Sequence, residues 1–182
     1  MAVKNNRRTI MTKKLLKTAL IELMQDKPIN KITIKDICEQ ADLSRSTFYL
    51  HYTDQYHLLN DLETEAISTI KGQIKQITPD LDPLIICREF ASYIHKEETI
   101  FRTLLCQEEN IHFQIRLIDE LHKYSVESLS FFSDTPERLN YKVDFIIHGS
   151  LSIFRNWILN GFDLSEQEIA ELTFDLCCQA LD

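Results

Sequence analysis

The amino-acid sequence predicts an all-α protein of about nine helices, with a small tri-helical unit at the N-terminus followed by a larger helical bundle. The chain of 182 residues contains only 3 Gly and 4 Pro, which leaves few of the turns that an all-β protein needs. Apolar residues recur at helical intervals of three and four positions, and no strand-like alternation stands out. The hydrophobic share of 44% is sufficient for a core and argues against disorder.

The first predicted helix runs from about Arg8 to Asp26. Its apolar positions are spaced as one face of an amphipathic helix: Leu16, Ala19, Leu20, Leu23 and Met24. Pro28 closes the helix, because proline has no backbone N–H to donate to the preceding turn. We therefore expect this helix to bury a single apolar stripe and to support the elements that follow it.

Two short helices are predicted after this proline. The segment Thr33–Asp36 has the form of a capping box and opens the first of them. Residues 41–43 break that helix, and Ser44 is placed to cap a further helix from Arg45 to about His51. The pattern is therefore a helix, a tight turn and a second helix.

A fourth and longer helix begins at Thr53 or Asp54 and extends to about Ile77. We place a domain boundary at its start, which gives residues 1–54 as the first domain and residues 55–182 as the second. No internal repeat or low-complexity tract occurs on either side of this boundary.

Capping residues, prolines and a glycine mark the later helices. Asp82-Pro83 and Thr135-Pro136 each place a capping side chain before a proline at the first helical position. Gly161 ends one helix, and Ser165–Glu168 forms a second capping box that opens the last one. The segment between these boundaries is expected to hold three helices, and its two breaks are predicted near Glu97 and Asn110.

The charge of the chain is unevenly distributed along its length. The net charge is −8, but the first 55 residues hold ten Lys/Arg and six Asp/Glu, a local charge of +4. The remaining residues hold ten Lys/Arg and twenty-two Asp/Glu, a charge of −12. A basic head on an acidic body fits a head that contacts phosphate groups, although many solvated helices are charged without any such role.

Several classes of protein are disfavoured by the sequence. No apolar run reaches the roughly 18 residues of a membrane span, and the basic N-terminus lacks the apolar region of a secretory signal, so we expect a cytoplasmic protein. The five cysteines contain no C-x-x-C pair, which argues against a zinc ribbon or a disulfide framework. No phosphate-binding loop, nucleophile elbow or metalloprotease motif is present. We expect neither an enzyme nor a cofactor or metal site.

The segment from Thr33 to Tyr52 carries the functional prediction. Two short helices joined by a tight turn, supported by an amphipathic first helix, form a tri-helical helix-turn-helix that presents its last helix to the major groove of DNA. The small core of this unit is predicted to consist of Ile34, Ile37, Cys38, Ala41, Leu43 and Phe48. The residues then left on the outer surface are Arg45, Ser46, Thr47, Tyr49 and His51.

The chemistry of these outer side chains suits DNA. Arg45 is long enough to reach a guanine or a phosphate, and the hydroxyl groups of Ser46 and Thr47 donate to bases or to the backbone. Tyr49 and His51 offer ring donors to phosphates. Thr33 adds a hydroxyl beside the free N–H groups of a helix N-terminus. The alternative is that this helix packs its tyrosine and histidine on a neighbouring helix.

The stretch from Thr33 to Leu59, which includes the sequence SRSTFYLHY at positions 44–52, resembles the DNA-binding signature of TetR-family regulators. With the preceding helix, the resemblance covers about the first third of the chain. It implies base contacts from three residues, Arg45, Ser46 and Thr47. It implies phosphate contacts from Thr33, Ser44, Tyr49 and His51, and it implies that Tyr52 packs beneath the fourth helix.

Two positions depart from the pattern of that family. Asp42 stands where a glycine is common in the turn, and aspartate tolerates the left-handed backbone conformation better than most residues. Gln55 stands where a lysine commonly contacts phosphate at the start of the fourth helix. We expect the missing charge to weaken DNA binding and to flatten its salt dependence.

Two apolar helices near the end of the chain are the candidates for dimerisation. In the first, one face carries Val143, Ile147, Ser150, Leu151, Phe154 and Ile158. In the second, the same period is followed by Ile169, Leu172, Thr173, Leu176, Cys177 and Ala180. Such helices usually cover a core. The resemblance implies that the last two long helices also pair with those of a second copy as a four-helix interface.

The predicted function is a homodimeric regulator, a repressor by analogy with most of the family, that binds a palindromic DNA operator and is released by an effector bound in the C-terminal domain. A transcriptional activator or co-regulator whose C-terminal domain binds a protein partner is the alternative. In the first case the effector would be a small molecule, whose identity the sequence does not indicate. Residues that could line a central cavity are His95, Phe101, His112, Gln114, His122, Tyr124 and His148, and each is more common as an ordinary core or surface residue.

Overall fold

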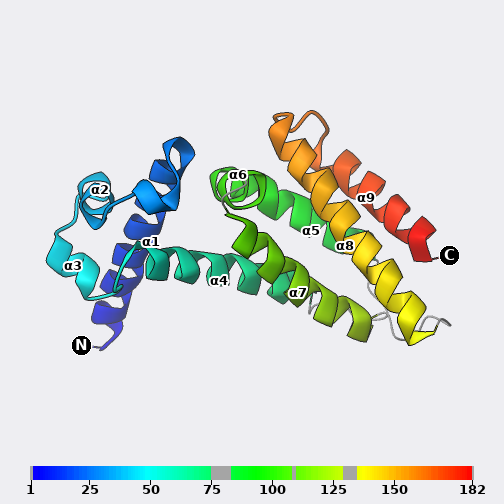
Figure 1. The fold of residues 1–182 in the computed structure, drawn as a ribbon, viewed down its shortest axis with the longest axis horizontal. Coiled ribbons are helices and arrows are strands. Elements are labelled where there is room, and N and C mark those ends of the chain that lie inside the picture. Colours follow the sequence, from blue (N-terminus) through cyan, green and yellow to red (C-terminus); the bar gives the residue numbers. More distant parts are fainter. Residues whose placement is uncertain (1, 75–82, 108–109, 129–134, 182) are drawn as a thin grey trace. The chain divides into compact units, whose positions relative to one another are not determined.

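The computed structural model describes residues 2–74, 83–107, 110–128 and 135–181 (Figure 1). Within these residues the chain is helical and contains no strand, which confirms the all-α prediction. The elements are α1 (Ala2–Asp26), the 3₁₀ turn η1 (Ile29–Lys31), α2 (Ile34–Gln40), α3 (Arg45–Tyr49), α4 (Gln55–Ile74), α5 (Pro83–Lys96), α6 (Glu98–Cys106), α7 (Ile111–Ser128), α8 (Pro136–Leu159) and α9 (Glu166–Leu181).

The chain divides into two compact units, residues 1–66 and residues 67–182, and the division falls inside α4. The first part of α4 clusters with the first unit because Tyr52 and α1 contact it through Asp61. The domain boundary expected after residue 54 stays a prediction. Within the described residues, no helix is long and apolar enough to cross a membrane.

The first unit is built on the predicted stripe of α1. Leu16 and Leu20 are fully buried, as is Phe48 from α3. Ile37, Cys38 and Ala41 of the predicted small core are buried as well. The two other members of that set, Ile34 and Leu43, are only half-buried, because they stand at the start of α2 and just after its end, where fewer elements cover them.

Both predicted caps of the helix-turn-helix form. The Thr33 hydroxyl accepts from the N–H of Asp36 at 3.1 Å, and the Asp36 carboxylate accepts from the N–H of Thr33 at 3.0 Å, which completes the capping box. The Ser44 hydroxyl accepts from the N–H of Thr47 at 3.1 Å and opens α3. Asp54 likewise caps α4 by accepting from the N–H of His57 at 2.8 Å.

The turn between α2 and α3 places Asp42 in the left-handed conformation, with φ of 51°. The N–H of Leu43 reaches back to the carbonyl of Cys38 at 2.9 Å, and the N–H of Asp42 reaches that of Glu39 at 3.3 Å. These two bonds form a Schellman motif, which terminates α2 and redirects the chain into α3. Aspartate at this position costs about 1 kcal/mol relative to glycine. The turn nevertheless forms, as the sequence predicts.

Helix boundaries differ from the sequence prediction at three points. α1 begins at Ala2 instead of about Arg8, because the added turn carries no residue that stops a helix. The turn η1 follows Pro28 and was not predicted; it is held by the N–H of Lys31, which donates to the Pro28 carbonyl at 2.9 Å. α3 ends at Tyr49, so His51 lies just beyond the helix.

The second unit contains α5 to α9 with the end of α4. The predicted break near Glu97 separates α5 from α6, and that near Asn110 separates α6 from α7. Thr135 caps α8 by accepting from the N–H of Arg138 at 3.4 Å. Ser165 and Glu168 form the predicted cap of α9 through bonds of 2.8 and 3.2 Å. Asp82, the expected cap of α5, lies outside the described residues.

The α8–α9 turn is a second Schellman motif. Gly161 adopts φ of 73°, and the N–H of Phe162 donates to the Trp157 carbonyl at 2.9 Å. The Phe162 ring then packs edge-on against the buried indole of Trp157, with ring centroids 4.7 Å apart. The indole N–H donates to the Leu164 carbonyl at 2.8 Å. The single tryptophan therefore fixes this turn from the inside.

Candidate nucleic-acid interface

α3 rests on Phe48, which is fully buried and orients the remaining side chains of this short helix. Tyr49 is 59% exposed, and its ring stands edge-on to Phe48 at 5.8 Å between centroids. Arg45 and Ser46 are exposed, whereas Thr47 and His51 are half-buried. The structure therefore places the predicted residues on or near the outer surface of the first unit.

The hydroxyl groups at the start of α3 form one cluster. The Ser44 oxygen lies 2.8 Å from that of Ser46 and 2.9 Å from that of Thr47, and it also caps the helix. Ser44 therefore positions the two other hydroxyls. A hydroxyl has one hydrogen and two lone pairs, so Ser46 and Thr47 keep capacity for an outside partner, whereas Ser44 uses its full capacity within the cluster and must exchange one of these contacts to bind a phosphate. Thr33, at the start of α2, is exposed and also keeps its hydroxyl hydrogen while it accepts from Asp36.

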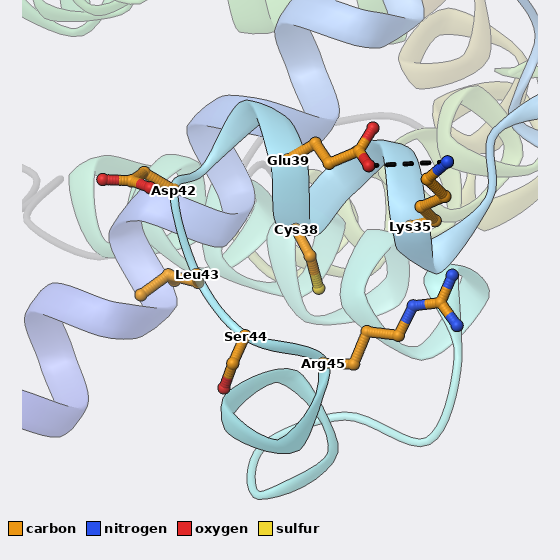
Figure 2. Close-up of a pocket in the computed structure, with 7 residues that line it drawn as sticks. All are labelled: Lys35, Cys38, Glu39, Asp42, Leu43, Ser44 and Arg45. Atoms are coloured by element: carbon orange, nitrogen blue, oxygen red, sulfur yellow. Dashed lines mark ion pairs between the residues drawn. The ribbon is translucent and has the colours of Figure 1, made fainter.

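Lys35 is a residue that the sequence analysis did not single out. It lines an open pocket of about 550 Å³ between α2 and α3, together with Arg45, Cys38 and Ser44 (Figure 2). Its ammonium is 3.6 Å from the carboxylate of Glu39, one helical turn away. The signal in the sequence is a lysine two residues after the Thr33 cap, but its proximity to Arg45 depends on the turn.

The pocket is lined by the thiol of Cys38 and by both basic and acidic side chains. Burial raises the pKa of the Cys38 thiol, although the positive charge of Arg45 opposes this effect. The thiol therefore stays protonated and acts as part of the core.

The pKa of Asp36 is lowered to about 2 by the backbone N–H of Thr33 and then by Lys27, whose ammonium lies 3.0 Å away. Asp36 is thus a fixed anion that holds the start of α2.

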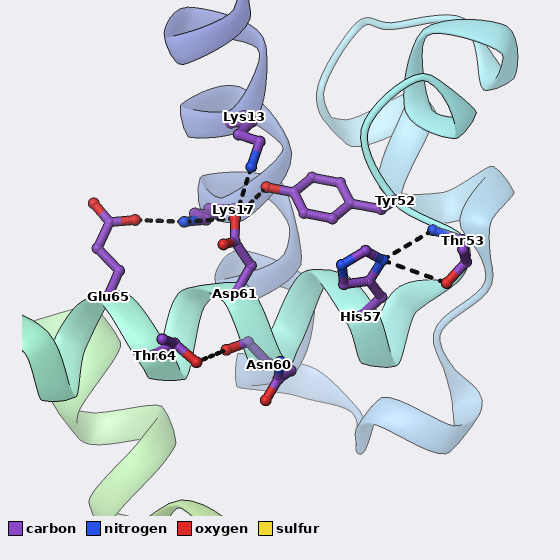
Figure 3. A network of polar contacts seen from close by, with 9 residues as sticks. All are labelled: Lys13, Lys17, Tyr52, Thr53, His57, Asn60, Asp61, Thr64 and Glu65. Atoms are coloured by element: carbon purple, nitrogen blue, oxygen red, sulfur yellow. Dashed lines mark hydrogen bonds and ion pairs between the residues drawn. The ribbon is translucent and has the colours of Figure 1, made fainter.

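A polar network joins α1 to α4 and includes Tyr52, three residues after the end of α3 (Figure 3). The buried Tyr52 donates its hydroxyl to Asp61 at 2.7 Å. The same carboxylate is 3.0 Å from the ammonium of Lys17 and 3.4 Å from that of Lys13, and Lys17 also pairs with Glu65. The Tyr52 ring is centred 5.9 Å from that of Phe48. The packing of Tyr52 beneath α4 agrees with what the sequence resemblance implies.

Asp61 is expected to give the first unit an acid-sensitive stability. Burial raises the pKa of Asp61, but the hydrogen bond from Tyr52 and the charges of Lys17 and Lys13 outweigh it and lower the pKa to about 2. A carboxyl whose pKa falls on folding stabilises the protein above its unfolded pKa near 4 and loses this contribution as the pH falls towards 2. We expect Asp61→Asn to lower the free energy of unfolding by about 1 kcal/mol at pH 7 after solvent screening.

Urea unfolding followed by circular dichroism between pH 7 and pH 2.5 measures this effect. The destabilisation caused by Asp61→Asn should shrink as the pH falls below 4, because the wild-type carboxyl then becomes protonated. Asp26→Asn, an exposed site at the end of α1, removes the same charge and serves as the control. A constant difference between Asp61→Asn and the wild type across this range contradicts the prediction.

In the second unit, some of the residues predicted to form the dimer interface are buried in the core and others are exposed. Val143, Ile147, Phe154 and Ile158 of α8 are buried in the unit's own core. A different stripe of α8 is exposed instead, with Tyr141 at 78% and Phe145 at 69%. On α9, Ile169 and Thr173 are buried. The large apolar residues that α9 exposes are Leu172 and Leu176.

Among the residues considered for a ligand cavity whose side chains are described, His122 and His148 share Asp144 as a partner, and others have separate contacts. Phe101 is buried and packs on Tyr93, whereas His95 is exposed and lies 2.7 Å from Glu166. Gln114 donates to the Leu105 carbonyl at 3.1 Å. His122 lies 3.4 Å from the carboxylate of Asp144, and His148 lies 2.8 Å from the carbonyl of the same residue. His112 is exposed, and the Tyr124 side chain lies outside the described residues. The described residues contain no cluster of three metal-ligating side chains.

Comparison with protein families gives two matches that together span both units. Residues 15–62 match the model described as bacterial regulatory proteins, tetR family. Residues 82–178 match the model described as transcriptional regulator C-terminal region, which covers more than half of the chain.

Two curated proteins are similar to parts of the chain. HTH-type transcriptional regulator YxbF from Bacillus subtilis is 25% identical over 96 residues, which is 50% of this chain and 25% of that protein. The HTH-type dhaKLM operon transcriptional activator DhaS from Lactococcus lactis is 34% identical over 56 residues, 31% of this chain and 30% of that protein. The matched regions thus span less than a third of either relative.

Solved structures are similar over nearly the whole chain. A TetR transcriptional regulator from Streptococcus agalactiae has a TM-score of 0.71 and 21% identity, covering 97% of this chain and 99% of that one. NalD from Pseudomonas aeruginosa, a repressor of a multidrug efflux pump, has a TM-score of 0.70 and 17% identity, covering 93% and 96%. At these identities the likeness establishes the fold.

Proposed function

Because this chain belongs to the TetR family of transcriptional regulators, we propose that it binds a palindromic DNA operator as a homodimer through α3. The observation that carries the proposal is the surface of α3, where Arg45, Ser46 and Tyr49 are exposed above the fully buried Phe48. A short helix fixed from below and polar above suits the major groove, which admits a helix of this width.

The roles proposed for the site residues follow from their reach and chemistry. Arg45, Ser46 and Thr47 contact base edges, because they occupy the first turn of α3. The residues proposed to contact phosphates are Thr33, Ser44, Tyr49 and His51. The pocket adds Lys35 to the basic side chains that face this surface, beside Arg45. Gln55 at the start of α4 supplies no charge, so we expect a shallower salt dependence than a lysine would give.

Selection of DNA from a random duplex pool by the full chain tests the proposal. We expect the recovered sequences to contain an inverted repeat whose half-sites are centred about 34–36 Å apart, or a multiple of one helical turn. Recovery of a single unrepeated site would exclude the palindromic dimer. The absence of any enriched sequence would exclude operator binding altogether.

Dimerisation is supported by the exposed stripe of α8, which carries Tyr141, Phe145 and Leu159. Gly149 lies on the same stripe, and a Cβ added to it meets no atom within 4 Å, so this part of α8 is open to close approach by another helix. Exposed apolar side chains gathered on one helix mark an interaction surface. We assign this stripe, with Leu172 and Leu176 of α9, to the partner copy in a four-helix interface.

The regulator either represses or activates transcription. We favour a repressor that an effector bound in the C-terminal unit releases from DNA, through a coupling free energy of about 1–3 kcal/mol between the two sites. The alternative is an activator with a protein partner on the C-terminal unit, and it is supported by the 34% identity over 56 residues to DhaS, a protein named as an activator. A reporter gene behind the selected operator separates them, because a repressor lowers its expression and an activator raises it.

A further inference from the structure

The N-terminal part of α1 carries an unbalanced positive charge. From Ala2 to Ile21 this helix contains six Lys and Arg residues and no Asp or Glu. Lys13 and Lys17 are neutralised by Asp61 and Glu65 of α4. The other basic residues of α1 have no such partner on α4 among the described residues.

Three of the remaining basic residues, Arg7, Arg8 and Lys14, have exposed side chains, and we call them the cationic surface of α1. In the part of the chain that the structure describes, none of the three forms an ion pair. Arg7 and Lys14 are two helical turns apart and share one side, and Arg8 stands about 100° from Arg7 around the helix. Such a surface is complementary to a polyanion.

The cationic surface lies on the helix that packs against α2 of the helix-turn-helix. The ammonium of Lys13 lies 5.2 Å from the centroid of the Tyr52 ring, and Tyr52 follows α3 after three residues. From Lys13 the helix continues for about three turns towards its N-terminus. Arg8 is about 7.5 Å further along the helix axis than Lys13.

We propose that the cationic surface of α1 contacts DNA phosphates outside the bases that α3 contacts. This inference rests on the proposed function and adds to it a second, sequence-independent contact. Arginine and lysine side chains bind phosphates through charge and release bound counterions, so the contact raises affinity for any duplex and steepens its salt dependence. Ile10, Met11 and Leu15 are exposed next to these cations. Such apolar side chains could also bind a second copy of the chain, and the test below distinguishes that case from DNA binding.

The test compares two double variants of the full chain that remove the same amount of charge. Arg7→Gln with Arg8→Gln removes two charges from the cationic surface. Lys96→Gln with Arg155→Gln removes two exposed charges from the second unit. The probes are two 30-base-pair duplexes, the selected operator and a scrambled duplex of the same composition, titrated at several concentrations of NaCl.

We expect the Arg7/Arg8 variant to bind both duplexes roughly tenfold more weakly, with a salt slope shallower by about 0.9 for each phosphate that is no longer neutralised. The Lys96/Arg155 variant should bind as the wild type does. Wild-type affinity and slope in the Arg7/Arg8 variant would refute the proposal, and so would an equal decrease in both variants, since net charge alone then explains the effect.

Two further outcomes separate this inference from the function on which it rests. If Arg45→Ala loses operator binding while the Arg7/Arg8 variant matches the wild type, the proposed function stands and the α1 contact is wrong. If the wild type binds neither duplex, both are wrong. A change of oligomeric state in the Arg7/Arg8 variant, with DNA affinity preserved, would assign the cationic surface to a second copy of the chain.

Discussion

Arg45→Ala and Tyr49→Ala are each expected to weaken operator binding by more than an order of magnitude while the protein stays folded and dimeric. Both side chains are exposed, so Phe48 stays buried when either is removed. Arg45→Ala should change the free energy of unfolding by no more than about 0.5 kcal/mol, whereas Tyr49→Ala also loses the edge-on contact with Phe48, worth about 0.5–1.5 kcal/mol. Removing a base or phosphate contact from one half-site costs about 1–3 kcal/mol of binding free energy. A homodimer bears this cost at both half-sites, about 2–6 kcal/mol in all, which corresponds to a decrease in affinity of roughly thirtyfold to twenty-thousandfold.

Titration of the selected operator and of a scrambled duplex measures this effect and also separates the two roles. Arg45→Ala should reduce the preference for the operator, because it removes a contact to a base, whereas Tyr49→Ala should weaken both duplexes alike. Lys96→Ala, an exposed site in the second unit, matches the charge change of Arg45→Ala and should bind as the wild type does. Unchanged operator binding in both variants of α3 would show that α3 is not the recognition helix.

Phe145→Glu is expected to convert the dimer into monomers and to weaken operator binding at least a hundredfold as a result. The side chain is 69% exposed, so a buried carboxylate arises only in the assembled interface, where an unpaired charge costs several kcal/mol. A monomer then holds one half-site alone and lacks the advantage of binding both halves together. Sedimentation or a sizing column gives the oligomeric state, and the same titration gives the affinity.

Gly149→Glu tests the same stripe without removing an apolar side chain. A Cβ at this position meets no atom within 4 Å, and glutamate favours a helix more than glycine by roughly 0.5–1 kcal/mol, so the isolated subunit should be at least as stable as the wild type. The interface should nevertheless be blocked by its bulk and charge. Ile115→Glu, on an exposed site of α7, is the control. Dimers that persist in both α8 variants would place the interface elsewhere.

The capped boundaries could be predicted because each depends on a few neighbouring residues. Thr33 with Asp36, and Ser165 with Glu168, bond to each other within one turn. The left-handed conformation at Asp42 is also a local property. The outer position of Arg45 and Tyr49 followed from the same argument, since a five-residue helix that buries Phe48 has little choice about what it exposes.

Other features of the site depend on residues distant in the sequence. Tyr52 meets Lys13, and shares the Asp61 carboxylate with Lys17, only because Asp61 of α4 reaches α1, and this arrangement leaves the cations of residues 7, 8 and 14 exposed. Lys35 joins Arg45 in one pocket because the turn at Asp42 folds α3 back beside α2. Neither arrangement has a signal in the spacing of the residues along the chain.

The sequence by itself determined the helical class, the capped helix-turn-helix and its polar surface, because hydrophobic period and capping are local properties. Only the tertiary structure decided which side of α8 is covered, since that helix carries apolar residues on both sides. Its contact with α7 buries Val143 and Ile147 against Leu121 and leaves Tyr141 and Phe145 exposed. Periodicity shows that a helix face is apolar, but the element that packs against it decides whether that face becomes core or interface.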